Sequence, residues 1–262
     1  MKPVTSLDRI AASGLTGVLF DLDDTFLDEG RLTEGAYAAL HRLSRAGFRL
    51  IAVTGRPAGW GEVIARQWPI DAVVTENGAL ALYRDGHALG RWQNADTATR
   101  SLRKARLAEG FAALQKDFPA LRASDDTHAR ETDFAIDIGE SVHLAADEIA
   151  RIETAARALG FRTFVSSIHL HLTLDPYDKA TGTVAFLHDR FGEDPTAARQ
   201  RFAYIGDSAN DAPCFFAFTS SFGVGNVTAS LARLSVPPRY FSGALRSAGF
   251  IEIANAILAC RD

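Results

Sequence analysis

The sequence contains little cysteine and no long apolar run. Cys214 and Cys260 are the two cysteines among 262 residues, which excludes a disulfide framework and a four-cysteine zinc site. The first residues, MKPVTSLDRIAASGL, lack the continuous apolar segment of a signal peptide. No apolar run approaches the roughly 20 residues that a helix needs to span a bilayer. We therefore expect a cytoplasmic protein with no membrane partner.

The chain also lacks an excess of positive charge. It has 28 Lys and Arg against 32 Asp and Glu, for a formal net charge of −4. Nucleic acids and anionic membrane surfaces both bind basic faces, so neither is an expected partner. The length allows one large domain or two smaller ones with a substantial core. The sequence leaves open whether the protein is a monomer or a homodimer.

Strand and helix patterns alternate in the first third of the chain. Apolar runs of strand length are separated by segments whose apolar residues recur at helical spacing, one of them with Thr33 as a candidate N-cap and Gly47 as a stop. This rhythm predicts a doubly wound parallel α/β sheet of the Rossmann-like kind. The expected strands are 17–22, 48–55 and 71–79, and the expected helices are 33–47 and 58–68.

The middle of the chain follows a different pattern. The segment TDFAIDI (132–138) places Phe134 and Ile136 on one face and Asp133 and Asp137 on the other, which predicts a half-buried strand. A predicted helix and two more strands follow, and then the alternating pattern resumes. We therefore predict a core formed by residues 1–83 and 173–262, with an α+β domain inserted at 84–172.

Carboxylates crowd together after the first predicted strand. The stretch GVLFDLDDTFLDEG carries Asp21, Asp23, Asp24 and Asp28 within eight positions. Like charges repel, and a carboxylate at the end of a buried strand is costly unless it is paired or bound to a metal. A solvated turn remains the alternative for this stretch taken alone.

Three further polar motifs follow the acidic stretch along the chain. Two of them, like Asp21, stand at the carboxyl ends of predicted strands, where doubly wound sheets bind ligands. Lys179 opens the helix that follows the inserted domain, so all four pieces can converge on one crevice. The three further motifs are Thr54-Gly55-Arg56, Lys179, and GDSAND with Asp207, Asn210 and Asp211.

Phosphoryl transfer through a carboxylate uses such a set of residues. An aspartate attacks phosphorus and forms an aspartyl-phosphate, which divides a difficult hydrolysis into two easier steps. Because two anions must approach each other, a hard cation such as Mg²⁺ is needed between them. A hydroxyl and a lysine then hold the phosphoryl oxygens as charge spreads over them.

The four motifs, in this order, resemble those of the haloacid dehalogenase-like phosphohydrolase superfamily, and the resemblance covers nearly the whole chain. It implies that Asp21 is the nucleophile and that Asp23 is the general acid and base. It also implies that Thr54 binds the phosphate and that Lys179 pairs with both nucleophile and phosphate. The Mg²⁺ ligands that it implies are Asp21, Asp23 through its carbonyl, Asp207, and Asp211 in or near the metal shell.

The inserted domain resembles the cap of the Cof-like sugar phosphatases, which include sucrose-phosphate, trehalose-phosphate and mannosyl-3-phosphoglycerate phosphatases. ENGA before the insertion and YDKATG after it carry this resemblance. It implies a phosphosugar substrate and a cap that sets specificity. Asp24 departs from the pattern, because that subgroup more often has glycine there, and we assign it no role.

Several polar residues are candidate substrate ligands with structural alternatives. Arg56 could equally form a structural ion pair, and Asn77 could serve the backbone of its own turn. His169 and His171 share one face of a predicted strand and are expected to line the cleft, although a zinc site would need a third ligand. Arg130 is a weaker candidate, whereas Asp28 and Glu29 are expected to be solvated. The predicted phosphate and substrate ligands are Thr54, Gly55, Arg56, Asn77, His169, His171, Lys179 and Asn210.

The sequence thus predicts a Mg²⁺-dependent phosphatase that acts on a small phosphate ester through an aspartyl-phosphate, and the resemblance implies that this ester is a phosphosugar. A phosphomutase of the same superfamily is one alternative, since it would return the phosphoryl group to a sugar. A non-catalytic binding protein on the same scaffold is the other. The residues that the chemistry needs are all present, which favours an enzyme.

Overall fold

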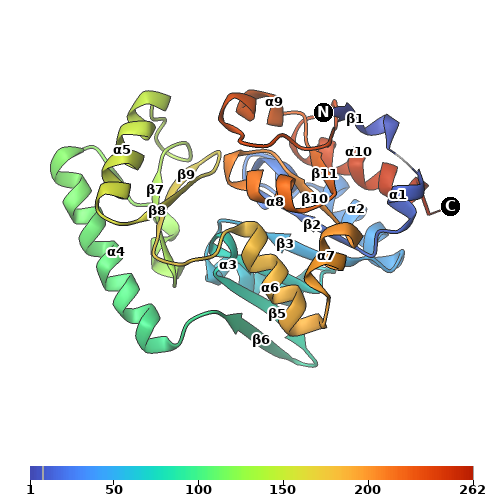
Figure 1. Ribbon diagram of the computed structural model, residues 1–262, viewed down its shortest axis with the longest axis horizontal. Helices are drawn as coiled ribbons and strands as arrows, with labels where there is room; N and C mark the ends of the chain where they lie inside the picture. Colours follow the sequence, from blue (N-terminus) through green and yellow to red (C-terminus); the bar gives the residue numbers. More distant parts are fainter. Residues whose placement is uncertain (8, 262) are drawn as a thin grey trace.

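The computed structural model describes residues 1–7 and 9–261, which form a core and an inserted domain side by side (Figure 1). Within these residues, a nine-stranded sheet of order β1-β12-β11-β10-β2-β3-β4-β5-β6 forms the core. Pairing is parallel from β1 to β4 and antiparallel for β5 and β6. The strands are β1 (Lys2–Pro3), β2 (Gly17–Phe20), β3 (Arg49–Val53), β4 (Ala72–Thr75), β5 (Leu80–Asp85), β6 (Ala88–Gln93), β10 (Phe202–Gly206), β11 (Ser220–Gly223) and β12 (Tyr240–Phe241).

Helices cover both faces of this sheet, as predicted for a doubly wound fold. Along β2, Val18 and Phe20 pack against α2, α3 and α10, whereas Leu19 packs against α6, α7 and α8. Burial on both faces explains why the strands are continuous apolar runs. The described core helices are α1 (Arg9–Ser13), α2 (Glu34–Arg45), α3 (Ala58–Gln67), α6 (Lys179–Phe191), α7 (Pro195–Arg201), α8 (Ala212–Ala217), α9 (Val227–Ser230) and α10 (Arg246–Ala259), and the short turns are η1 (Val4–Ser6), η2 (Leu22–Phe26), η3 (Glu76–Gly78), η5 (Ala209–Asp211) and η6 (Leu231–Arg233).

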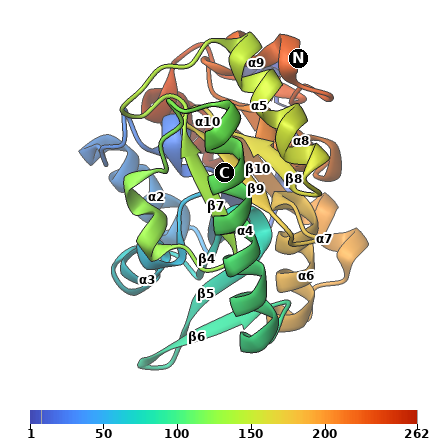
Figure 2. The same cartoon turned by 90° about the vertical axis from the view of Figure 1, so that its left-hand side faces the viewer.

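The inserted domain has its own antiparallel sheet and its own apolar core. The sheet has the order β7-β9-β8, and the helices α4 and α5 pack on one of its faces (Figure 2). Its elements are α4 (Thr97–Asp117), η4 (Asp125–Ala129), β7 (Asp133–Asp137), α5 (Ala146–Ala158), β8 (Arg162–Val165) and β9 (His169–Thr173). No helix of the described residues is both long enough and apolar enough to cross a membrane.

Two predictions about the insertion are corrected. The domain boundary predicted at residue 84 is too early, because β6 pairs with β5 and extends the central sheet to Gln93. The strand β7 is not half-buried, because Asp133 and Asp137 are 4% and 5% exposed. Its polar face packs toward the core domain instead of facing solvent.

Candidate active site

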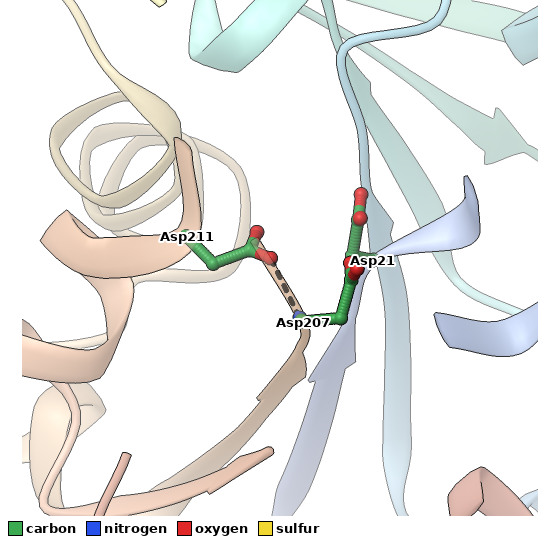
Figure 3. A group of neighbouring side chains, drawn as sticks. All are labelled: Asp21, Asp207 and Asp211. Carbon is green, nitrogen blue, oxygen red and sulfur yellow. Dashed lines mark hydrogen bonds between the residues drawn. The ribbon is translucent and has the colours of Figure 1, made fainter. Parts of the chain in front are cut away.

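The carboxyl ends of β2 and β10 bring the acidic residues together. These strands are parallel neighbours, and each continues directly into an aspartate, Asp21 after β2 and Asp207 after β10. The ligand oxygens of Asp21, Asp207 and Asp211 lie within 4.8 Å of one another, and all three residues are buried (Figure 3). The acidic stretch after β2 is therefore not simply a solvated turn, because Asp21 is buried.

Lys179 joins this cluster as the first residue of α6. Asp178 caps that helix by accepting hydrogen bonds from the backbone N–H groups of residues 180 and 181. The Nζ of Lys179 lies 2.8 Å from Asp21 Oδ1 and 2.7 Å from Asp211 Oδ1, with its side chain fully buried. Segments that are far apart in the sequence thus meet at one point.

Asp211 lies in the cluster, but its carboxylate is already filled by four donors. Its Oδ1 accepts from Lys179 Nζ and from the Tyr204 hydroxyl at 2.5 Å, and its Oδ2 accepts from the backbone N–H groups of Asp207 and Ser208 at 2.9 and 3.0 Å. An ionised carboxylate offers about four lone-pair sites. In this structure Asp211 thus braces Lys179 and the loop after β10, and its place in or near the metal shell stays a prediction.

Asn226, which the sequence analysis did not single out, holds Asp207 in place. Its Nδ2 donates to Asp207 Oδ2 at 2.9 Å and to the backbone carbonyl of Asp24 at 3.0 Å. The Thr25 hydroxyl donates to the other oxygen, Asp207 Oδ1, at 3.1 Å. Asn226 follows β11 closely, so its position beyond the carboxyl end of a parallel strand was the signal that could have revealed it.

Asp24 occupies a conformation that favours glycine. Its φ of 54° lies in the left-handed region, which aspartate tolerates better than most residues. This explains why the related subgroup uses glycine at this position. The carboxylate of Asp24 pairs with Arg246 at 3.2 Å, and Asp28 and Glu29 pair with the same guanidinium at 3.2 and 2.8 Å. Both Asp28 and Glu29 remain largely exposed, as predicted, while they pair with Arg246.

Arg56 connects Asp23 to the inserted domain. Its guanidinium donates to both oxygens of Asp23 at 2.9 to 3.1 Å, to Glu140 at 2.9 Å and to Asp126 at 3.4 Å. It also lies 4.3 Å from the centre of the Trp60 ring. All of its nitrogens are engaged in this structure, which is the ion-pair alternative, and the substrate contact of Arg56 stays a prediction.

Glu140 is the partner of Arg56 and His169 on the inserted domain. The His169 hydrogen bond, at 2.9 Å, and the Arg56 charge lower the pKa of Glu140 to about 2. His169 is buried, and its Nε2 is hydrogen-bonded to Glu140, so its predicted place in the substrate cleft stays a prediction. The ion pair between Arg56 and Glu140 joins the inserted domain to the core next to Asp23.

Glu76 forms a second connection between the two domains. Its buried carboxylate accepts from the backbone N–H of Ala58, at the start of α3, and from those of Glu131, Thr132 and Asp133. Burial raises its pKa, against the opposing effect of these donors. The loop that follows β4 thus fixes the inserted domain over the carboxyl ends of the core strands.

The remaining predicted ligands surround the loop after β3. Thr54 is fully buried and accepts a hydrogen bond from the backbone N–H of Arg56 at 3.0 Å. Asn77 donates its backbone N–H to the Thr54 carbonyl at 3.1 Å, and its Oδ1 accepts from Asn210 Nδ2 at 3.2 Å. Three core strands therefore deliver Thr54, Asn77 and Asn210 to one place, with His171 of the inserted domain above Gly55.

The electrostatics of the acidic cluster suit a cation. Burial raises the pKa of Asp21 to about 8, although Lys179 opposes this rise, and burial together with Asp211 raises the pKa of Asp207. The charge of Lys179 is already shared by Asp21 and Asp211. Asp207 receives only neutral donors from Thr25 and Asn226, so its charge is left without a cationic partner in the described residues. Oxygen ligands with excess negative charge fit a divalent metal ion.

His171 makes the stability of the fold depend on pH. Burial lowers its pKa to about 4, even though Asp133 opposes this, and Arg130 and His169 add positive charge nearby. In the unfolded chain the imidazole of His171 takes up a proton near pH 6.5. In the folded chain it does so only near pH 4. We therefore expect the free energy of unfolding to fall by about 3 kcal/mol as the pH drops from 6.5 to 4, and to be unaffected by this group above 6.5.

Urea unfolding at several pH values between 7.5 and 4 measures this effect. Between pH 6.5 and 4, the free energy of unfolding should fall less steeply in His171→Asn than in the wild type, since the variant lacks the titrating ring. Glu140 contributes in a separate window, because its lowered pKa stabilises the fold above pH 4.5 and loses that effect only toward pH 2. Equal slopes in both proteins between pH 6.5 and 4 would contradict the assignment to His171.

Comparison with known proteins agrees with this geometry. Residues 18–103 match the family described as haloacid dehalogenase-like hydrolase. This confirms the resemblance found in the motifs, and the match includes the segments that carry Asp21, Thr54 and Asn77. No curated protein sequence matches this chain.

Solved structures share the haloacid dehalogenase-like fold of both domains. A protein from Thermoplasma acidophilum has 17% identity and a TM-score of 0.70, covering 93% of this chain and 98% of its own. The sucrose-phosphatase of Synechocystis sp. PCC6803, solved with sucrose and phosphate, has 16% identity and a TM-score of 0.63, with 93% and 98% coverage. A sugar phosphatase of subclass IIB of this superfamily has 16% identity and a TM-score of 0.62, with the same coverage.

Proposed function

We propose that the chain is a Mg²⁺-dependent phosphatase of small phosphorylated metabolites, with a phosphosugar as its substrate class. The observation that carries this proposal is the meeting of Asp21, Lys179 and Asp207 at one buried point. The sugar phosphatases among the fold relatives support the substrate class. A non-catalytic binding protein would have no need for buried carboxylates that are costly to maintain without a ligand.

Asp21 is the nucleophile in this proposal. Its carboxylate oxygen forms a bond to phosphorus while the ester oxygen leaves, and Asp23 gives that oxygen a proton. Asp23 then removes a proton from water, whose oxygen attacks the aspartyl-phosphate, releasing phosphate and restoring Asp21. Lys179 and the Thr54 hydroxyl hold the phosphoryl oxygens during both steps.

Asp21, the Asp23 carbonyl and Asp207 would hold Mg²⁺, which supplies positive charge between the nucleophile and the phosphate. Asp211 orients Lys179 and the loop after β10 instead of binding the metal. Asn226 and Thr25 keep Asp207 pointed at the site. Four residues therefore fix two carboxylates. Lys179, held by Asp211, fixes Asp21, and Asn226 and Thr25 fix Asp207. Electrostatic catalysis requires such preorganisation.

The leaving group has a polar cavity beside Asp23. A cavity of about 380 Å³ lies between the core and the inserted domain, and charged side chains of both domains line it. A second, larger cavity of about 540 Å³ is lined by Asn210 but not by Asp23. We assign the leaving group to the first cavity, since the proton donor must reach the ester oxygen. Its lining includes Asp23, Arg56, Glu140, His143 and Arg246.

Phosphate release measured against Mg²⁺ concentration tests this function. We expect the protein to release phosphate from p-nitrophenyl phosphate and from members of a hexose and pentose phosphate panel. The activity should be absent in EDTA and should return when Mg²⁺ is added. Ca²⁺ should restore less activity than Mg²⁺, because the larger ion takes more ligands in a less regular geometry. Isomerisation of a hexose phosphate without phosphate release would instead indicate a phosphomutase.

A further inference from the structure

Tyr204 is a tyrosine in the middle of the otherwise apolar strand β10. It is fully buried, and its hydroxyl donates a hydrogen bond to Asp211 Oδ1 at 2.5 Å. A phenylalanine would fill nearly the same space, so packing alone does not require the hydroxyl. No step of the proposed mechanism uses this hydroxyl either. Its role must therefore lie in what it does to Asp211.

The apolar core fixes the Tyr204 ring. Side chains alternate along β10, so Tyr204 points to the face of the sheet that α6, α7 and α8 cover, whereas Ala203 and Ile205 point to the other face. The ring stacks on Phe218, with ring centres 6.1 Å apart and planes at 13°. It also meets Phe215 at an interplanar angle of 73°, with ring centres 5.9 Å apart. The hydroxyl is thus held at one point by aromatic packing.

The Tyr204 hydroxyl and the Lys179 ammonium share one oxygen of Asp211. Asp211 Oδ1 accepts from Tyr204 at 2.5 Å and from Lys179 Nζ at 2.7 Å, while Oδ2 accepts from the backbone N–H groups of Asp207 and Ser208. A carboxylate oxygen has two lone pairs. The hydroxyl therefore fills the lone pair that Lys179 leaves free on Oδ1.

This sharing sets the direction of the Lys179 ammonium. An ammonium group has three N–H donors. One donates to Asp211 Oδ1 and a second donates to Asp21 Oδ1 at 2.8 Å, whereas the third has no acceptor within residues 1–7 and 9–261. Because two donors are fixed on two carboxylates, the third has a defined direction. It is the donor that can reach a phosphoryl oxygen in the proposed mechanism.

Loss of the hydroxyl would change how Lys179 is shared. The ammonium lies almost equally far from Asp211 and Asp21, at 2.7 and 2.8 Å. Without Tyr204, Asp211 Oδ1 would have Lys179 as its single donor and would attract the ammonium more strongly, since hydrogen bonds to charged groups are the strong ones. We expect Lys179 to shift toward Asp211, which turns its third donor away from the phosphate.

We propose that Tyr204 is a positioning residue of the phosphate-binding site, which acts on Lys179 through the shared oxygen of Asp211. Tyr204 itself contacts neither the substrate nor the metal in this assignment. Phosphate monoesters and free inorganic phosphate are the ligands whose binding depends on it, because both present the oxygens that Lys179 holds. This inference rests on the proposed phosphatase function and adds a residue to its phosphate-binding site.

Tyr204→Phe tests the role of the hydroxyl, because it keeps the ring. We expect KM for p-nitrophenyl phosphate to rise by about 10-fold with kcat within about 3-fold of the wild type, since Lys179 holds the phosphoryl oxygens equally before and during the reaction. A merely structural role would lower the melting temperature or the apparent kcat and leave KM unchanged. An unchanged KM in folded Tyr204→Phe would overturn the inference.

Tyr37→Phe is the matched control. The Tyr37 hydroxyl donates to the Gln67 carbonyl at 3.3 Å, so this variant also removes one hydroxyl hydrogen bond from a core helix. It should keep the wild-type KM. The Mg²⁺ concentration for half-maximal activity should also stay unchanged in Tyr204→Phe, because Asp207 keeps both of its side-chain donors. A raised Mg²⁺ requirement would place the effect at the metal and would overturn the route through Lys179.

Phe218→Leu is a second variant, which decides the question if Tyr204→Phe does not fold. It keeps every donor of Asp211 but removes the ring on which Tyr204 stacks. The hydroxyl is then held less rigidly, and we expect KM to rise by about 3-fold with kcat little changed. A wild-type KM in this variant would overturn the positioning role of Tyr204.

Calorimetry with inorganic phosphate at saturating Mg²⁺ separates this inference from the proposed function, because it needs no turnover. We expect the Kd of phosphate to rise by about 10-fold in Tyr204→Phe and to be unchanged in Tyr37→Phe. If this holds although the wild type hydrolyses no ester, the phosphatase function fails and the role of Tyr204 stands. If the wild type hydrolyses esters but binds phosphate no better than Tyr204→Phe, the function stands and the role fails. A wild type that binds no phosphate would overturn the role as well.

Discussion

Replacing Asp21 by asparagine is expected to lower kcat for phosphate release by at least about 10⁴-fold, because the variant lacks the attacking carboxylate. The fold should persist, since the asparagine oxygen can still accept the 2.8 Å hydrogen bond from Lys179. Phosphate release from p-nitrophenyl phosphate at saturating Mg²⁺ measures the loss. Circular dichroism and the melting temperature show whether the variant is folded.

Asp28→Asn is the matched control for this experiment. Asp28 lies in the same acidic stretch but is largely exposed and pairs only with Arg246 in the described contacts. The control should keep its turnover within about 3-fold of the wild type, as expected for an exposed ion pair that contributes little. If Asp21→Asn hydrolysed the aryl phosphate as fast as this control, Asp21 could not be the nucleophile.

The core fold follows from the sequence because its strands are buried on both faces. Residues 17–20 and 49–53 are continuous apolar runs, and such runs alternating with amphipathic helices allow few arrangements besides a doubly wound sheet. The segment of β6 was assigned to the insertion because a polar, basic stretch begins within it at Arg91. Its place in the central sheet depends on antiparallel pairing with β5, which no pattern within β6 itself reveals.

The chemical residues were also predictable, because their positions depend on topology alone. Parallel neighbours end at the same edge of the sheet, so Asp21, Thr54 and Asp207 had to lie together once the strands were known. The partners of these residues were not predictable. Arg56 bonds to Asp126 and Glu140, which come from 70 and 84 residues further along the chain. Such pairs depend on how the inserted domain docks, and the sequence does not encode that in any local pattern.

The misjudged face of β7 illustrates the same limit. Alternation of Asp133 and Asp137 with apolar residues indicates two chemically different faces but does not say what each face contacts. Solvent is the usual partner of a polar face, whereas here Asp133 contacts Arg130 and His171. A buried polar face requires matching donors from elsewhere, and here they come from Arg130, directly after η4, and from β9. This is why the sequence located the histidines but not the hydrogen bonds behind one of them.

Asp211→Asn is expected to lower the free energy of unfolding by about 3–5 kcal/mol, because it breaks a buried ion pair and leaves its partners unsatisfied. The carboxylate of Asp211 accepts from Lys179, Tyr204 and two backbone N–H groups. In either orientation of the asparagine amide, its NH₂ group faces other donors. These are either Lys179 and Tyr204 or the two backbone N–H groups. Urea unfolding in EDTA measures this loss without any contribution from bound metal.

Asp207→Asn is the comparison that separates bracing from metal binding. Asp207 receives hydrogen bonds only from the neutral donors of Thr25 and Asn226, so its substitution should change the urea midpoint much less. It should instead raise the Mg²⁺ concentration for half-maximal phosphate release by more than about 10-fold, as loss of a charged ligand does. The activity that survives in Asp211→Asn should keep a nearly normal Mg²⁺ requirement. The opposite pattern, with wild-type stability and a raised Mg²⁺ requirement in Asp211→Asn, would make Asp211 a metal ligand and would mean that its four donors rearrange when the metal binds.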